Sequence, residues 1–127
     1  MDQAALVEAD INSGARLVQR LDSSGFAVKA AFWWLDPETR EWHLVVATPL
    51  VDDPGPRVAY ERLQEAMAGI EDDSVPVTRV FLLSPNHPMI SLLRGAISTG
   101  GEGISGIRFS RNTINGVFVE DAYIYRI

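Results

Sequence analysis

Residues 26–51, FAVKAAFWWLDPETREWHLVVATPLV, decide how the chain folds. Two runs rich in Val, Phe, Trp and Leu flank residues 36–41, in which a Pro follows an Asp. That dipeptide opens a type I turn, and four-residue hairpin loops are commonly built on this turn. The stretch is therefore predicted to form a β-hairpin in which Leu35 lies opposite Trp42.

Both faces of this hairpin are apolar. Side chains alternate between the two faces of a strand, so the sequence divides into two sets. One face is predicted to carry Ala31, Trp33, Leu35, Trp42, Leu44 and Val46, and the other Val28, Ala30, Phe32, Trp34, His43, Val45 and Ala47. A strand pair that is apolar on both faces requires cover on both sides.

The rest of the chain predicts three helices and three further strands from its hydrophobic periodicity. The helices are expected over residues 4–24, over 57–70 and from 85–88 onwards, and the strands over 75–84, 107–114 and 117–127. Asn115-Gly116 is a strong signal for the turn of a second hairpin. Gly14 costs about 1 kcal/mol relative to Ala inside a helix, which indicates that a neighbouring group lies close to it.

The predicted fold is a single α+β domain over residues 1–127, with the element order αββαβαββ. Right-handed crossovers between parallel strands would place the second and third helices on the same face. The simplest arrangement is a five-stranded mixed sheet of order 1-2-3-4-5, in which strands 2, 3 and 4 are parallel. The helices then pack mainly on one face, and the first helix either joins that layer or crosses to the other face.

The composition is that of a folded soluble protein, with 46% hydrophobic and 22% charged residues. The formal net charge of -6 disfavours binding to the phosphate backbone of nucleic acids. The chain has no cysteine, which excludes disulfides and thiol catalysis and fits a reducing compartment. No signal-peptide pattern is present, and no apolar stretch reaches the ~18 residues of a membrane span, so a cytoplasmic protein without membrane contact is expected.

Polar residues follow the predicted parallel strands at their carboxyl ends, where open α/β sheets bind ligands. They are Asp52 and Asp53 after strand 2, Ser84, Asn86 and His87 after strand 3, and Arg111 and Asn112 in strand 4. A carboxylate pair, an imidazole and a guanidinium suffice for acid–base or metal-assisted hydrolysis by a small hydrolase or nuclease-like enzyme. The catalytic candidates are therefore Asp52, Asp53, His87 and Arg111. The alternative is that these residue types only cap helices.

The sequence predicts neither a cofactor nor a metal ion. Residues 101–106, GEGISG, match the pattern GxGxxG, but dinucleotide binding needs a strand before the pattern and a helix after it. The predicted order here is the reverse. Two histidines and no cysteine provide too few ligands for a soft metal. The open alternative is a hard cation at Asp52 and Asp53, since such cations bind carboxylate oxygens.

One face of the C-terminal hairpin is predicted to be a binding surface. In the register set by the Asn115-Gly116 turn, Ser110 lies opposite Asp121. The same register places Arg111 opposite Glu120. The residues expected to contact a ligand or a partner are Arg108, Ser110, Asn112, Asp121 and Tyr123. An ordinary solvated face with paired charges is the alternative.

The leading functional hypothesis is a non-catalytic association or regulatory module that acts through protein–protein contacts. The predicted helices are too few to cover both faces of the first hairpin. A patch of Phe32, Trp34 and Val45 would then stay exposed, and such patches normally mark contacts. A twofold contact buries one patch twice, so a homodimer is predicted, with a further protein as a second kind of partner. The enzyme described above is the alternative.

Overall fold

The structure is a computed structural model that describes residues 6–68, 75–97 and 103–127. These residues form α1 (Glu8–Ser23), β1 (Ala30–Leu35), β2 (Trp42–Ala47), η1 (Pro49–Val51), α2 (Pro56–Met67), η2 (Val77–Arg79), β3 (Val80–Leu83), α3 (Pro88–Ala96), β4 (Ile107–Ile114) and β5 (Val117–Arg126). The two η elements are single 3-10 turns. The predicted α+β class is confirmed. Gly101 and Glu102 of the glycine-rich segment, and the expected end of the second helix at Ile70, lie outside the described residues.

The first hairpin forms in the predicted register, with Leu35 opposite Trp42 and Ala30 opposite Ala47. Its loop is closed by the Asp36 N–H, which donates to the Glu41 carbonyl oxygen over 2.9 Å. The Asp36 carboxylate accepts the N–H of Glu38 over 2.8 Å inside the turn. The hairpin is therefore determined by local sequence, through its turn residues and its apolar runs.

The sheet has the strand order β3-β2-β1-β5-β4, so the predicted order 1-2-3-4-5 is wrong. β2 and β3 are parallel as predicted, but β5 pairs antiparallel with β1, and β4 pairs antiparallel with β5. The prediction that strand 4 runs parallel to strand 3 is therefore also wrong. The physical reason is burial: β1, AAFWWL, is apolar on both faces and takes the centre of the sheet, whereas the four-residue β3 lies at an edge.

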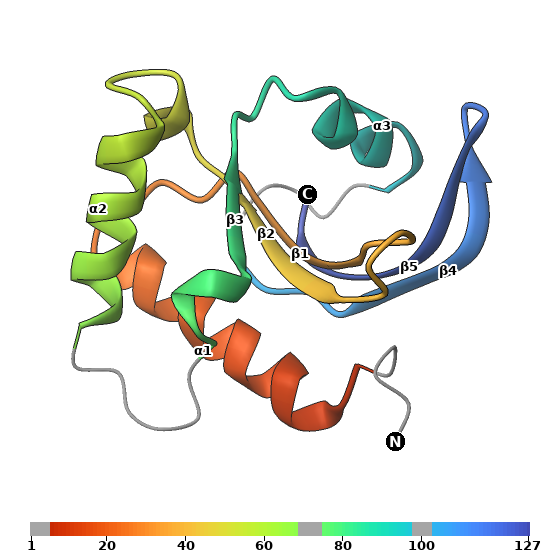
Figure 1. The fold of residues 1–127 in the computed structure, drawn as a ribbon, viewed down its shortest axis with the longest axis horizontal. Helices are drawn as coiled ribbons and strands as arrows, with labels where there is room; N and C mark the ends of the chain where they lie inside the picture. Colours follow the sequence, from red (N-terminus) through yellow and green to blue (C-terminus); the bar gives the residue numbers. More distant parts are fainter. Residues whose placement is uncertain (1–5, 69–74, 98–102) are drawn as a thin grey trace.

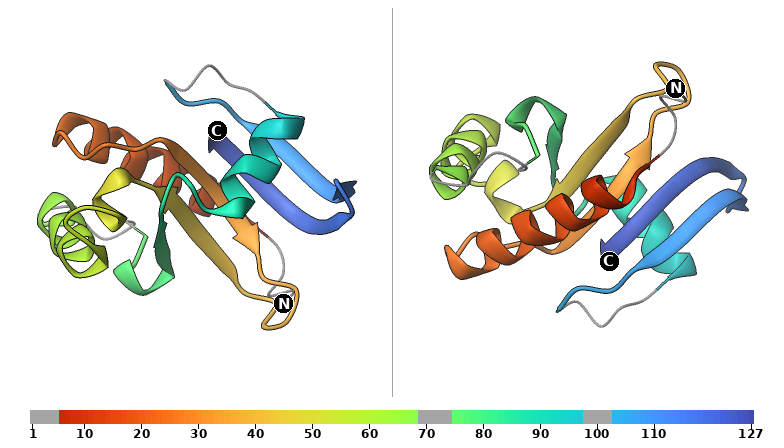
Figure 2. Two further views of the ribbon diagram at one scale, coloured as in Figure 1. Left: turned by 90° about the horizontal axis from the view of Figure 1, so that it is seen from above. Right: turned by 90° about the horizontal axis from the view of Figure 1, so that it is seen from below.

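The helices cover both faces of the sheet, contrary to the one-face prediction (Figures 1 and 2). α1 and α2 pack on one face, where Leu17 and Leu63 join the core around Trp33. α3 packs on the other face, where Ile90 and Leu93 join a second core. The crossover argument fails here because β4 does not follow β3 in the sheet. The chain instead runs from one edge to the other, and it carries α3 across the second face.

α3 covers the apolar patch that was predicted to stay exposed. Phe32 is 0% and Val45 is 4% exposed, and both pack in the second core with Ile90. Trp34 is half-buried at the border of that core. The premise of the predicted interface, an uncovered second face, is therefore wrong. These three residues make internal contacts.

The second hairpin also forms in the predicted register, with Ser110 opposite Asp121 and Ile114 opposite Val117. Asn115 and Gly116 have φ angles of 48° and 82°. Both values belong to the left-handed region that a type I′ turn requires, and Asn-Gly is the preferred dipeptide for it. The turn therefore lies at Asn115-Gly116, as predicted.

The hairpin bends sharply at Arg111, which has a φ of 48° and is not among the paired residues of the β4–β5 ladder. Before the bend, the odd-numbered Phe109 of β4 faces the core under α3. After the bend, the even-numbered Ile114 faces that core, together with Val119 of β5, so the alternation of side chains along β4 shifts by one residue at Arg111. Figure 1 shows the hairpin curving towards α3. Asn112, which pairs with Val119, therefore lies on the α3 side of the sheet. The prediction that it shares a face with Arg108 is wrong.

Candidate functional site

Residues at the carboxyl ends of β2 and β3 form a hydrogen-bonded cluster. The Ser84 hydroxyl donates to Asp52 Oδ2 over 2.7 Å and accepts the Asn86 N–H over 3.0 Å. The His87 N–H donates to the Ser84 carbonyl oxygen over 3.0 Å. His87 Nδ1 accepts the Met89 N–H over 3.1 Å at the start of α3. The structure thus brings Asp52, Ser84 and His87 together.

The hydrogen bonds of Ser84 and His87 hold the loop and cap the helix that follows it. A nucleophilic serine needs an adjacent base to take its proton. Here the Ser84 hydroxyl donates to the Asp52 carboxylate and not to the His87 imidazole, whose Nδ1 accepts the Met89 N–H, so these two residues form no Ser–His pair. His87 therefore caps the first turn of α3, and Ser84 ties the loop before it to Asp52. Asp53, the neighbour of Asp52, lines a pocket beside η1.

Arg111 lies far from this cluster. β4 and β3 are the two edges of the sheet, separated by four strand spacings of about 4.8 Å each. β4 also runs antiparallel to β2 and β3, so its carboxyl end points to the opposite end of the sheet. Arg111 therefore does not share a cleft with Asp52 and His87. Within the described parts of the chain, no three acidic or histidine side chains are grouped closely enough to hold a metal ion.

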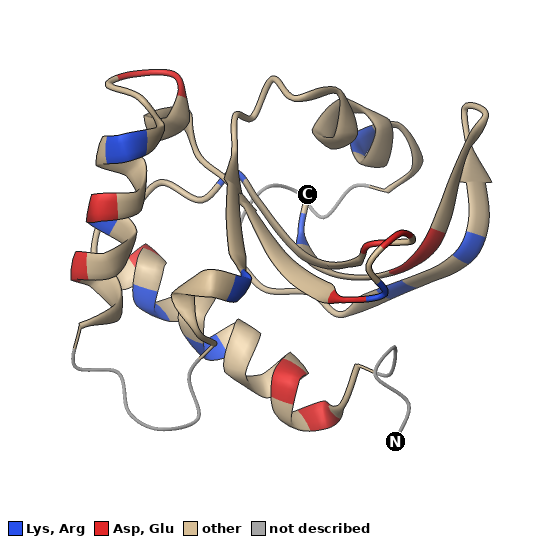
Figure 3. Ribbon diagram, in the orientation of Figure 1, with Lys and Arg blue, Asp and Glu red and all other residues tan. Residues whose placement is uncertain are grey.

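A second polar cluster lies on the C-terminal hairpin. Arg108 binds Asp121 through two contacts, Nε to Oδ1 over 2.6 Å and Nη2 to Oδ2 over 2.5 Å. The Ser110 hydroxyl donates to Asp121 Oδ1 over 2.8 Å. The Arg108 guanidinium also lies over the ring of Trp42, 5.6 Å from its centroid. The predicted binding residues Arg108, Ser110 and Asp121 thus form one unit, and Figure 3 shows both signs of charge on β4 and β5.

This part of the sheet carries no helix among the described elements. α1 covers this face of the sheet as far as Tyr125, whose hydroxyl donates to the Ile11 carbonyl oxygen of α1 over 2.6 Å. Beyond Tyr125 no described helix lies over the same face of the hairpin (Figure 1). We name this surface the open face; it consists of Arg108, Ser110, Thr113, Phe118, Asp121 and Tyr123. The sequence predicted four of these six residues and missed Thr113 and Phe118, because the bend at Arg111 brings them to this side.

The contact between Arg108 and Asp121 shifts the pKa values of both groups. Partial burial alone would raise the pKa of Asp121, but hydrogen bonds from Arg108 and Ser110 outweigh it and hold the pKa below the usual aspartate value. The hydrogen bond to Asp121 raises the pKa of Arg108. The two side chains are therefore held as a charged pair.

We expect Arg108→Met to raise the pKa of Asp121, because burial then acts without the opposing guanidinium. A carbon-detected NMR titration of the Asp121 carboxyl group measures this directly. In the wild type the folded-state pKa is depressed, so the carboxylate stabilises the fold above its unfolded-state pKa of about 3.9. That contribution is lost as the pH falls through the folded-state pKa. Arg108→Met should therefore weaken the acid dependence of stability, and an unchanged Asp121 titration would contradict the assignment.

Comparison with protein-family models, curated proteins and solved structures finds no match to this chain. Among the described residues, the helices are too short or too polar to cross a membrane.

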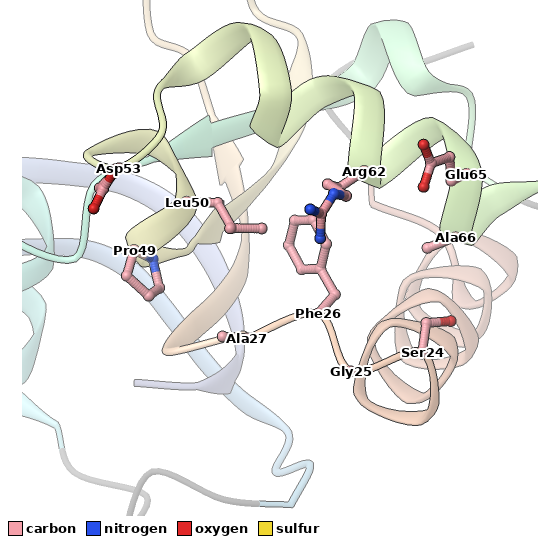
Figure 4. Close-up of a pocket in the computed structure, with 10 residues that line it drawn as sticks. All are labelled: Ser24, Gly25, Phe26, Ala27, Pro49, Leu50, Asp53, Arg62, Glu65 and Ala66. Carbon is pink, nitrogen blue, oxygen red and sulfur yellow. The ribbon is translucent and has the colours of Figure 1, made fainter.

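A pocket that the sequence did not predict opens beside η1 and α2 (Figure 4). Its lining comes from the loop after α1, from η1 and from α2. Three segments that are distant in the sequence contribute one or a few residues each, and no local pattern marks them. Only the tertiary packing of α1 against α2 creates this pocket.

Proposed function

We propose that this protein is a non-catalytic association module that forms a homodimer through the open face. The observation that carries the proposal is Phe118, which is 55% exposed on a sheet face where the described residues form no helix. Beside it stand Arg108, fixed by Asp121, and the half-buried Tyr123. Arginine and aromatic side chains are the types that interfaces favour and that dominate binding energy.

Charge supports a contact of this face with itself. The chain as a whole has a formal net charge of -6, which opposes self-association. On the open face, however, Arg108 and Asp121 balance each other. A twofold contact places the same residues on both sides, so Arg108 of one copy can lie opposite Asp121 of the other. The open face is therefore a surface on which two acidic molecules meet with little repulsion.

The enzyme alternative has less support, because His87 is engaged as the cap of α3, Ser84 bonds Asp52 in the loop before it, and Arg111 lies on the far edge of the sheet. The acidic charge favours a protein partner over a nucleic acid. The chain has no cysteine and so forms no disulfide, which fits a reducing compartment, and we expect it in the cytoplasm. A second, different protein could use the same face.

Light scattering after gel filtration at micromolar concentration tests the homodimer. We expect the wild type to show about twice the chain mass of 14.0 kDa. Phe118→Ser should return the mass to that of one chain, because it removes the apolar centre of the contact. The matched control is Phe81→Ser on β3, another exposed phenylalanine (43%) that lies away from the open face. A wild type that remains monomeric, or a Phe118→Ser variant that remains dimeric, would show that the open face is not the interface.

A further inference from the structure

The pocket beside α2 has the size of a small-molecule site, and its lining combines apolar with charged side chains. Its volume is about 360 Å³, within the range of about 300 to 1,000 Å³ that is typical of ligand pockets. Phe26, Leu50 and Ala66 provide apolar surface, and Arg62 and Glu65 provide charge. Figure 4 shows these side chains converging from the loop after α1, from η1 and from α2.

The loop that carries Phe26 is fixed by hydrogen bonds to the end of α1. Gly25 has a φ of 77°, and its N–H donates to the Asp22 carbonyl oxygen over 3.2 Å. The Phe26 N–H donates to the Leu21 carbonyl oxygen over 3.0 Å. This left-handed glycine is a regular way to end a helix, and it directs the phenyl ring inwards. The buried phenyl ring, 6% exposed, therefore forms one wall of the pocket.

The opposite walls are fixed as well. Arg20 of α1 donates from Nε to the Ala66 carbonyl oxygen of α2 over 3.0 Å. The Gly55 N–H donates to the Leu50 carbonyl oxygen over 3.0 Å, which ties η1 to the start of α2. A ligand would therefore meet backbone walls that are already in place, and only the exposed Arg62 and Glu65 side chains would be ordered by binding.

Arg62 is the unusual member of this lining. It makes no hydrogen bond, ion pair or ring contact with any residue that the structure describes. Arg57 on the same helix binds Glu61 over 3.3 Å, and Arg20 binds backbone carbonyls of α2. Glu65 lies three residues after Arg62, so both side chains are on neighbouring positions of one helix face. A guanidinium and a carboxylate, both exposed, thus line a pocket of mixed polar and apolar character, and neither is paired with the other.

We propose that this pocket binds a free α-amino acid with an apolar side chain. The ligand carboxylate would take two hydrogen bonds from the Arg62 guanidinium, which matches carboxylate geometry. The ligand ammonium would lie against the Glu65 carboxylate, and the apolar side chain would pack on Phe26 and Leu50. A phosphate ligand fits less well, because Glu65 and Asp53 at the pocket would repel its charge.

Calorimetric titration with L-leucine and L-phenylalanine tests the proposal. We expect Arg62→Ala to weaken binding at least tenfold, because it removes the charge-assisted hydrogen bonds to the carboxylate. The matched control is Arg57→Ala, which removes an arginine of the same helix that does not line the pocket. Circular dichroism verifies that both variants are folded. The homodimer plays no part in this measurement, so the two proposals can fail separately.

Two ligand variants separate the two ends of the amino acid. Leucinamide lacks the carboxylate and should bind the wild type at least tenfold more weakly than leucine. N-acetyl-leucine lacks the ammonium and should bind the wild type more weakly than leucine. It should bind the Glu65→Gln variant as well as it binds the wild type, because it has no ammonium to contact Glu65. The proposal is overturned if neither amino acid binds at millimolar concentration, if Arg62→Ala binds like the wild type, or if leucinamide binds as well as leucine.

Discussion

Replacing Gly14 with valine is expected to lower the free energy of unfolding by about 3 kcal/mol, which is at the upper end for a residue that overpacks a core. A Cβ at this position would collide with the Tyr125 hydroxyl and lie 2.8 Å from Trp33 Nε1. Both rings are buried at the centre of the first core. Neither can move aside without displacing other core residues, so α1 would have to lift from the sheet.

The collision also breaks a buried hydrogen-bond chain. The Tyr125 hydroxyl accepts the Trp33 Nε1–H over 2.9 Å and donates to the Ile11 carbonyl oxygen of α1 over 2.6 Å. Burial raises the pKa of Tyr125 well above its usual value, so the hydroxyl keeps its proton for Ile11. Unpaired buried donors cost about 1–3 kcal/mol each, which adds to the steric effect.

Gly95→Ala in α3 is the matched control for this substitution. Apart from the adjoining residues and the backbone of α3, no atom of the described residues lies within 4 Å of a Cβ built at Gly95, so the added methyl has room. Alanine is favoured over glycine in a helix by up to about 1 kcal/mol, and this variant should be slightly more stable than the wild type. Urea denaturation of both variants measures the difference. A Gly14→Val variant that unfolds at the wild-type midpoint would show that α1 does not lie on Trp33 and Tyr125.

Gly14 illustrates which features the sequence can predict. A glycine in a helix is unfavourable without a compensating contact, so its presence alone indicated a close neighbour. The registers of both hairpins were equally predictable, because each depends on a turn of a few residues. The identity of the neighbour was not predictable, since Tyr125 lies 111 residues after Gly14.

The strand order shows why the rest could not be predicted. The residues of β5 contain no pattern that predicts pairing with β1. The pairing instead follows because the apolar β1 lies at the centre of the sheet, with a neighbouring strand on each side. The strand-end cluster around Ser84 was nevertheless placed correctly, because it depends only on the parallel pair β2 and β3. Arg111 was misplaced because its position depended on the global strand order. Its left-handed backbone also has no signal in a sequence, since arginine rarely adopts it.

Replacing Asp22 with alanine is expected to lower the free energy of unfolding by about 2 kcal/mol, because it leaves a buried arginine without its counter-charge; the 42% exposure of the Asp22 side chain keeps the effect below that of a fully buried pair. Arg126 is 4% exposed at the end of β5. Its Nη1 and Nη2 bind the two oxygens of Asp22 over 3.0 and 2.8 Å. It also donates to the carbonyl oxygens of Val28 over 3.1 Å and Gly103 over 2.9 Å. One guanidinium thus joins α1, the start of the first hairpin and the segment before β4.

The charge explanation can be separated from the loss of contacts by a double variant. Asp22→Ala with Arg126→Met removes both charges and keeps an apolar side chain of similar length. We expect it to be more stable than Asp22→Ala alone, because no uncompensated charge stays buried. Glu120→Ala is the control: its partner Arg40 has a side chain that is 51% exposed, and exposed pairs contribute at most about 1 kcal/mol. Urea denaturation of the three variants decides between these causes. If Asp22→Ala costs no more than Glu120→Ala, water replaces the carboxylate and Arg126 does not hold these three segments together.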